Sequence, residues 1–256
     1  MSDSAVQIPG ELLARLARFG RVHLREQVDS TNEYAFSLAA RREPAVVLAR
    51  RQTAGRGRFR RRWFSDDGSL TFSLLLFVGA DDPALPIGQL TLLTGLAVSQ
   101  GIQDVTGARA TIRWPNDLML NERKICGILC KQRRDALVVG IGLNVNQSAF
   151  PEIADLGEAG SIAQATGREW EKLELLDAIL RRFFAILERA RNDELPALLD
   201  EFKTRSAVLH RRVEARTMFR RHIGTVVDID SEGRLVIRRS DGGIVAVNSG
   251  QVRRLR

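Results

Sequence analysis

The chain has 256 residues, of which 44% are hydrophobic and 27% charged, a composition that excludes an intrinsically disordered protein. No apolar run approaches the roughly 18 residues of a membrane helix and the N-terminus lacks a signal-peptide core, so we expect a cytoplasmic protein without membrane contact. The net charge of +8 comes almost entirely from arginine, since only four of the 39 basic residues are lysines. It reflects either an anion-binding surface or arginines spread evenly over the surface.

The first elements alternate between helices and strands. Apolar periodicity predicts helices over residues 9–19 and 32–41 and strands over residues 22–28 and 44–50. The short polar residues Ser30 and Thr31 precede the second helix, so we expect them to cap it.

The segment QTAGRGRFRRRWFS, residues 52–65, contains five arginines, two glycines and no acidic residue. Its glycines and like charges predict an extended, mobile loop rather than regular structure. Taken alone, it is equally compatible with a specific anion site and with an unstructured basic loop.

The middle of the chain is rich in strands. We expect strands at residues 69–77, 110–114, 117–120, 124–131 and 136–146, with helices at residues 86–105, 170–190 and 196–203. This order predicts an α+β fold with a mixed β-sheet of about seven strands flanked by helices. Cys126 and Cys130 lie too close in sequence for a useful disulfide, and no histidine has metal-ligand spacing with them, so we expect no metal site.

From about residue 208 the chain changes character. Five short alternating strands separated by SEG and DGG turns predict a small antiparallel barrel of SH3-like size. We therefore divide the chain into a catalytic or binding domain, residues 1–206, and a C-terminal domain, residues 207–256.

The dipeptide Asn121-Glu122 separates two strand-like runs and predicts a two-residue hairpin turn. In that register Met119 pairs with Lys124, and Asp117 lies diagonally across from Lys124 on the same face. The two side chains then form either part of a shared site or an ordinary hairpin salt bridge.

Five segments, taken together, resemble the biotin protein ligase family. They are DSTN (29–32), QTAGRGR with RWFS (52–65), RWPNDLML (113–120), RKICGIL (123–129) and GIGLNVN (140–146). The resemblance implies a catalytic domain of the class II aminoacyl-tRNA synthetase and biotin ligase type. It further implies an ATP-dependent ligase that forms biotinyl-5′-AMP and transfers biotin to a lysine of the biotin carboxyl carrier protein of acetyl-CoA carboxylase or a related carboxylase.

The resemblance also suggests which residues act. Lys124, Arg58 and Asp117 would be catalytic. The biotin and nucleotide would be bound by Ser30, Thr31, Asn32, Gln52, Arg56, Gly57, Arg58, Trp63, Asn116, Lys124, Gly142 and Asn144. Biotin and ATP would be substrates, and Mg²⁺ would accompany the triphosphate, although the sequence names no metal ligand. Arg60 stands where the family loop has a third glycine, so the loop geometry is expected to differ.

Two other functions remain open. A lipoate or octanoate ligase or transferase shares this architecture, and a basic nucleic-acid-binding module would explain the arginine-rich segment but not WPND, Lys124 or Gln52. Only 28 residues precede Asp29, too few for the DNA-binding domain that makes some family members repressors, so we expect no DNA partner. The oligomeric state stays open, with a homodimer as one option.

Overall fold

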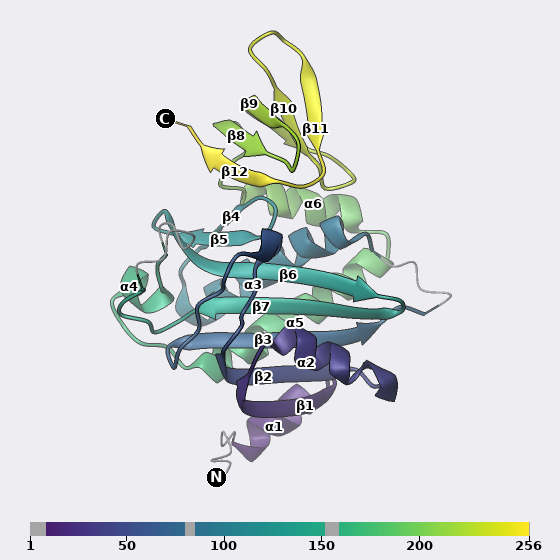
Figure 1. The fold of residues 1–256 in the computed structure, drawn as a ribbon, viewed down its shortest axis with the longest axis vertical. Helices are drawn as coiled ribbons and strands as arrows, with labels where there is room; N and C mark the ends of the chain where they lie inside the picture. Colours follow the sequence, from purple (N-terminus) through teal and green to yellow (C-terminus); the bar gives the residue numbers. More distant parts are fainter. Residues whose placement is uncertain (1–8, 80–84, 152–158, 256) are drawn as a thin grey trace.

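The structure is a computed structural model that describes residues 9–79, 85–151 and 159–255, without the side chain of Arg60 (Figure 1). Its centre is a seven-stranded sheet in the order β1-β2-β3-β7-β6-β5-β4. The strands are β1 Arg21–Val28, β2 Ala45–Gln52, β3 Ser69–Phe77, β4 Thr111–Arg113, β5 Asp117–Leu120, β6 Arg123–Arg133 and β7 Ala136–Asn144. β1 and β2 are parallel and all other neighbours antiparallel, which confirms the predicted mixed sheet.

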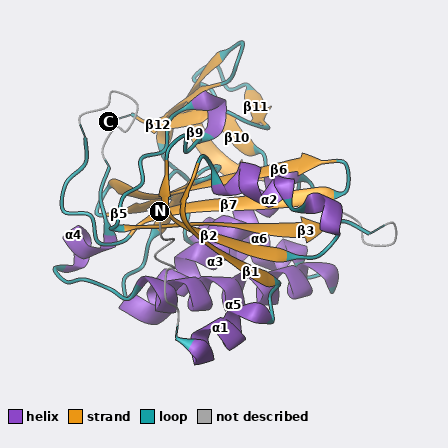
Figure 2. Cartoon of the chain, turned by 60° about the horizontal axis from the view of Figure 1, so that its bottom comes forward, coloured by secondary structure: helices purple, strands orange, loops and turns teal. Residues whose placement is uncertain are grey.

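The helices cover the two faces of this sheet unequally. They are α1 Gly10–Ala17, α2 Thr31–Ser37, α3 Ile87–Thr106, α4 Ile162–Thr166, α5 Lys172–Arg191 and α6 Leu195–Thr204. Figure 2 shows α1, α3 and α5 on one face, while α2 lies on the other. Most of the second face is therefore left to loops and to the C-terminal unit.

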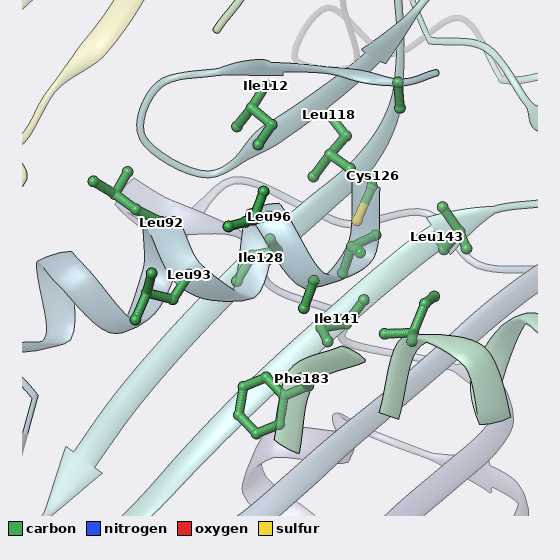
Figure 3. Packing of buried hydrophobic residues seen from close by; sticks show 14 of the residues in the cluster. Leu92, Leu93, Leu96, Ile112, Leu118, Cys126, Ile128, Ile141, Leu143 and Phe183 are labelled. Carbon is green, nitrogen blue, oxygen red and sulfur yellow. The ribbon is translucent and has the colours of Figure 1, made fainter. Parts of the chain in front are cut away.

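The main hydrophobic core lies between the sheet and its covered face. Leu92, Leu93 and Leu96 of α3 pack against Ile128 and Ile141 of the sheet, all at most 3% exposed (Figure 3). Burial of such side chains contributes about 1.5–3 kcal/mol each, so this face anchors the fold.

Two local predictions need correction. The helix expected over residues 32–41 ends at Ser37 and is followed by a separate 3₁₀ turn, Ala39–Arg41, which ends where Arg42 takes the left-handed conformation with φ 54°. Helix α4 was missed because its five residues are too short for a periodic signal; Ser161 and Gln164 cap it reciprocally.

The C-terminal unit is a five-stranded antiparallel sheet in the order β11-β10-β9-β8-β12, as the alternating pattern predicts. Its strands are β8 Arg212–Arg216, β9 Arg221–Ile229, β10 Leu235–Arg238, β11 Ile244–Val247 and β12 Gln251–Arg254. Within the described ranges, no helix is long and apolar enough to cross a membrane.

The C-terminal unit packs closely on the larger one. The indole N–H of Trp114, a 2% exposed residue, donates to the carbonyl of Gly233 at 2.9 Å. Lys203 of α6 lies 3.0 Å from Asp228 of β9. One hydrophobic cluster includes side chains of both units, so the core is continuous across residues 206 and 207. The division into two domains at this point stays a prediction.

Candidate active site

A cleft of about 1820 Å³ lies on the open face of the sheet and is bordered by the C-terminal unit. It is lined by the arginine-rich loop, the β5–β6 hairpin, the start of α2, and strands β8 and β12. All candidate site residues that the sequence suggested line this cleft: Ser30, Thr31, Asn32, Gln52, Arg56, Gly57, Arg58, Trp63, Asn116, Asp117, Lys124, Gly142 and Asn144. The sequence motifs therefore converge on one place in the fold.

Strand β3 supplies a row of small polar side chains beneath the cleft. Ser69, Thr71 and Ser73 are at most 3% exposed and alternate with the apolar residues that face the core. Their partners on β7 are Asn144, Gly142 and Gly140 respectively. This face of the sheet is thus polar and low in relief, whereas the opposite face is hydrophobic.

Gln52 caps the start of α2. The backbone N–H of Thr31 donates to the Gln52 side-chain oxygen at 2.8 Å, and the Thr31 hydroxyl lies 3.2 Å from the same oxygen. Ser30 occupies the N-cap position, but its side chain makes no cap hydrogen bond, so the predicted Ser/Thr cap is wrong. The parallel pairing of β1 with β2 makes this possible, because it places Gln52 opposite Val28, shortly before α2.

Asn32 is held in a fixed orientation. Its amide nitrogen donates to the carbonyl of Leu129 at 3.0 Å, and the hydroxyl of Ser73 donates to its oxygen at 2.7 Å. A Cβ atom at Gly140 would overlap the Asn32 amide oxygen. Gly140 is therefore required for Asn32 to reach this position.

Two further glycines leave a flat stretch of backbone, the glycine platform, on which an aromatic ring lies. Gly127 and Gly142 are paired across β6 and β7, and the indole of Trp63 lies on both, so that a Cβ at Gly142 would collide with its ring. The Trp63 ring N–H is buried without a hydrogen-bond partner in the described structure. The Lys124 ammonium lies 5.7 Å from the ring centroid, which is within cation–π range.

Lys124 and Asp117 meet as predicted, although the register shifts between Leu118 and Met119, so that Asp117 pairs with Gly127. Met119 pairs with Lys124, and Lys124 Nζ lies 2.6 Å from Asp117 Oδ1, while Arg113 donates to Oδ2 at 2.9 Å. Burial of Asp117 favours its neutral form, but the charges of Lys124 and Arg113 outweigh this effect and lower its pKa. Asp117 is consequently an ionised group that orients two cations.

Arg58 is a partly buried cation without a carboxylate partner among the described residues. Its guanidinium donates to the neutral Asn116 side-chain oxygen at 3.4 Å and forms no ion pair within the described residues. Burial lowers its pKa, and the more distant charge of Asp117 acts in the opposite direction. A partly buried guanidinium without a carboxylate partner is suited to bind an anionic ligand.

The arginine-rich loop is folded, and the expected extended conformation is wrong. Gly57 N–H donates to the Arg61 carbonyl at 2.8 Å, Trp63 N–H donates to the Gly55 carbonyl at 2.9 Å, and residues 58–60 form a 3₁₀ turn. Phe59, rather than a glycine, takes the left-handed conformation with φ 55°. The missing acidic residues are replaced by neutral partners on other elements, including Asn116.

Arg56 and Asn144 occupy contrasting positions. Arg56 is exposed and lines the cleft. Asn144 is 5% exposed, and its amide donates to the carbonyl of Gly160 at 2.9 Å and lies 3.4 Å from that of Lys124. Asn144 thus ties the end of β7 to the strand that carries Lys124, and its part in ligand binding stays a prediction.

Sequence reasoning missed four residues of this site: Ser73, Arg113, Gly127 and Gln251. The alternating polar residues of β3 could have indicated Ser73, and Arg113 directly precedes the WPND segment. By contrast, nothing in the sequence pairs Gln251 with the loop 190 residues earlier, where its side-chain oxygen accepts a hydrogen bond from Arg61 at 2.6 Å.

The two cysteines of the site region are buried and unpaired. Cys126 and Cys130 are free and buried, and burial raises the pKa of the Cys130 thiol to about 11, so neither is a reactive thiolate. In the described part of the chain no three His, Cys, Asp or Glu side chains cluster to hold a metal ion.

Comparison with known proteins agrees with this geometry. Residues 24–148 match the Biotin/lipoate A/B protein ligase family, and residues 209–253 match the biotin protein ligase C-terminal domain. The biotin–[acetyl-CoA-carboxylase] ligase of Mycobacterium tuberculosis is 32% identical to the chain, with 90% of this chain and 87% of that protein covered. The chain belongs to the biotin protein ligase family.

Other family members give the same relationship. The bifunctional ligase/repressor BirA of Bacillus spizizenii is 32% identical, and the comparison covers 93% of this chain and 78% of BirA. The biotin protein ligase of Aquifex aeolicus, solved with biotin and ATP, superposes with a TM-score of 0.81 at 29% identity, covering 92% of this chain and 99% of that one. The similarity thus extends over both the sheet and the C-terminal unit.

Proposed function

We propose that this biotin protein ligase forms biotinyl-5′-AMP in the cleft and then transfers biotin to a lysine of a biotin carboxyl carrier protein in the cytoplasm. The observation that carries the proposal is that two cations, Arg58 and Lys124, line one cleft with the glycine backbone of Gly127 and Gly142. Two cations beside bare backbone suit a reaction in which a carboxylate must approach a polyphosphate.

In the first half-reaction, an oxygen of the biotin carboxylate attacks the α-phosphorus of ATP and the bond to pyrophosphate breaks. A carboxylate is already ionised at neutral pH, so no base is needed. Arg58 and Lys124 offset the repulsion between the two anions, and Asp117 keeps Lys124 in place. Catalysis then consists mainly of positioning and charge neutralisation.

In the second half-reaction, the neutral amine of the acceptor lysine attacks the acyl carbon, the bond to AMP breaks, and the amine releases one proton to solvent as the amide forms. The lowered pKa of Asp117 makes it a weak base, so we assign it an orienting rather than a proton-removing role. Ser30, Thr31, Asn32 and Gln52 would bind the ureido ring of biotin, because they line the cleft together and internal hydrogen bonds hold Thr31, Asn32 and Gln52 in place.

Mg²⁺ would neutralise part of the triphosphate charge and arrive bound to the nucleotide. Asp117 is committed to Arg113 and Lys124, and the described residues contain no cluster of three metal ligands. The residues of the cleft therefore suit a Mg²⁺ ion that enters with ATP better than one bound permanently by the protein.

Biotin-dependent exchange of pyrophosphate with ATP tests this function. We expect exchange with biotin and Mg²⁺ and not with lipoate or octanoate. Exchange supported by lipoate or octanoate alone would assign the chain to the lipoate branch of the superfamily, and absence of exchange with all three acids would refute the proposal.

A further inference from the structure

The turn between β8 and β9 displays two large apolar side chains to solvent. Met218 is 77% exposed and Phe219 is 89% exposed, more than any other large hydrophobic side chain in the described residues. Thr217 fixes the turn, because its N–H donates to the Arg220 carbonyl at 2.8 Å and its hydroxyl accepts from the Arg220 N–H at 2.9 Å. The two side chains are presented by a hydrogen-bonded turn, and adjacent exposed large apolar side chains are typical of a surface that binds another protein.

This turn directly follows a strand that lines the cleft. Arg216, the last residue of β8, lines the cleft and pairs with Gln251 at the start of β12. Gln251 in turn accepts the hydrogen bond from Arg61 of the arginine-rich loop. Met218 and Phe219 therefore follow within three residues of the wall of the active site.

The surroundings of the turn are positively charged. Arg220 is exposed, and its side chain forms no ion pair or hydrogen bond in the part of the chain described. Arg216 and Arg221 share a single carboxylate, Glu214, so their combined charge exceeds that of their partner. The turn thus presents an apolar centre with a cationic border.

We propose that residues 216–221 form the docking surface for the protein that accepts biotin. The inference rests on the proposed function, because only a protein acceptor has to place a lysine in this cleft while the rest of it stays outside. Methionine and aromatic side chains are enriched where proteins bind one another, and the cationic border selects a partner that is acidic around its target lysine. The partner is a small carrier domain with an apolar patch and acidic residues beside that lysine.

The double variant M218S/F219S tests the proposal against I244S, a matched change at a 56% exposed residue on β11, the opposite edge of the same sheet. Three rates are measured: biotin-dependent pyrophosphate exchange, transfer of biotin from its adenylate to hydroxylamine, and kcat/KM for the biotin carboxyl carrier protein. Hydroxylamine nitrogen attacks the acyl carbon and AMP leaves, so this reaction needs no docking.

We expect M218S/F219S to lower kcat/KM for the carrier protein roughly tenfold or more, through KM, with exchange and hydroxylamine transfer within about twofold of wild type. I244S should leave all three rates unchanged. R220E should weaken the carrier reaction and reduce its dependence on ionic strength.

Unchanged carrier kinetics in M218S/F219S, or an equal loss with hydroxylamine, would overturn the docking surface. A wild-type dimer that dissociates in M218S/F219S while carrier kinetics persist would assign the turn to self-association instead. If instead the proposed function is wrong, the wild-type protein itself will show no biotin-dependent pyrophosphate exchange, which distinguishes the two failures.

Discussion

Arg61 and Gln251, 190 residues apart in sequence, are joined by a hydrogen bond of 2.6 Å from the guanidinium to the side-chain oxygen. This bond connects the arginine-rich loop to the edge strand β12 across the mouth of the cleft. A hydrogen bond to a charged group contributes about 1.5–3 kcal/mol when shielded from water, and less at an exposed position such as this.

Replacing Gln251 with alanine should therefore loosen the loop. We expect trypsin to cut the ligand-free variant several times faster at Arg56, Arg58, Arg61 or Arg62, and biotinyl-adenylate to be lost faster from the cleft. In both proteins, biotin with ATP should slow cleavage, whereas lipoate with ATP should not. Gln132→Ala, which removes an exposed glutamine of β6 bonded only to the nearby Arg134 carbonyl, is the control. Equal cleavage of Q251A and wild type would show that the bond does not hold the loop.

Lys124→Ala should reduce adenylate formation far more than folding stability. A charge placed at developing negative charge is typically worth about 2.7–4 kcal/mol, so pyrophosphate exchange should fall roughly 10²- to 10³-fold. Stability should change little, because Arg113 still pairs with Asp117 at 2.9 Å. Lys131→Ala removes another lysine of the same strand, paired with Glu33 at 3.1 Å, and should retain near-normal exchange. Normal pyrophosphate exchange in K124A would show that Lys124 only forms a structural salt bridge with Asp117.

Asp117 makes the stability of the fold sensitive to acid. Its pKa is lower in the folded than in the unfolded chain, so its contribution is fully present above about pH 4 to 5 and is lost as pH falls through the folded value. Asp117→Asn should remove this part of the acid dependence and lower stability at neutral pH by about 1–3 kcal/mol. Urea unfolding of wild type and D117N between about pH 3 and 7 gives the difference in the free energy of unfolding as a function of pH. A difference that grows as pH falls would contradict the assignment.

Gly140→Ala should impair biotin binding. The added methyl group would overlap the Asn32 amide oxygen, so Asn32 would have to leave its bonds to Leu129 and Ser73. We expect KM for biotin in the exchange reaction to rise at least roughly tenfold, with a smaller effect on KM for ATP. Gly88→Ala, at a position with nothing within 4 Å of the new Cβ, is the matched control. An unaltered KM for biotin in G140A would exclude Asn32 from the biotin site.

Short-range patterns explain which parts of this fold were predictable. The apolar runs of β3, β6 and β7 identify strands because each is buried on its covered face. The Asn121-Glu122 turn fixes the pairing of Met119 with Lys124, but not the register shift beyond Met119 that pairs Asp117 with Gly127. Both signals involve residues within ten positions of each other.

Contacts between residues that are far apart in the sequence could not be predicted from such patterns. The parallel pairing that brings Gln52 to Thr31 and the packing that brings Gln251 to Arg61 depend on the whole sheet order. The loop conformation depends on Phe59 accepting a left-handed backbone, which neither its size nor its charge indicates.

The indole on the glycine platform makes tryptophan fluorescence a probe of ligand binding. Of the three tryptophans, Trp114 and Trp170 have their ring N–H groups bonded, to Gly233 and Thr166 respectively, whereas that of Trp63 is unbonded within the described structure. Trp63 lies against bare backbone and near an ammonium group, so its emission responds to any molecule that enters between them. We expect the change in intrinsic fluorescence on adding ligand to come mainly from Trp63, and its loss in Trp63→Phe separates it from any signal of Trp114, which also lines the cleft.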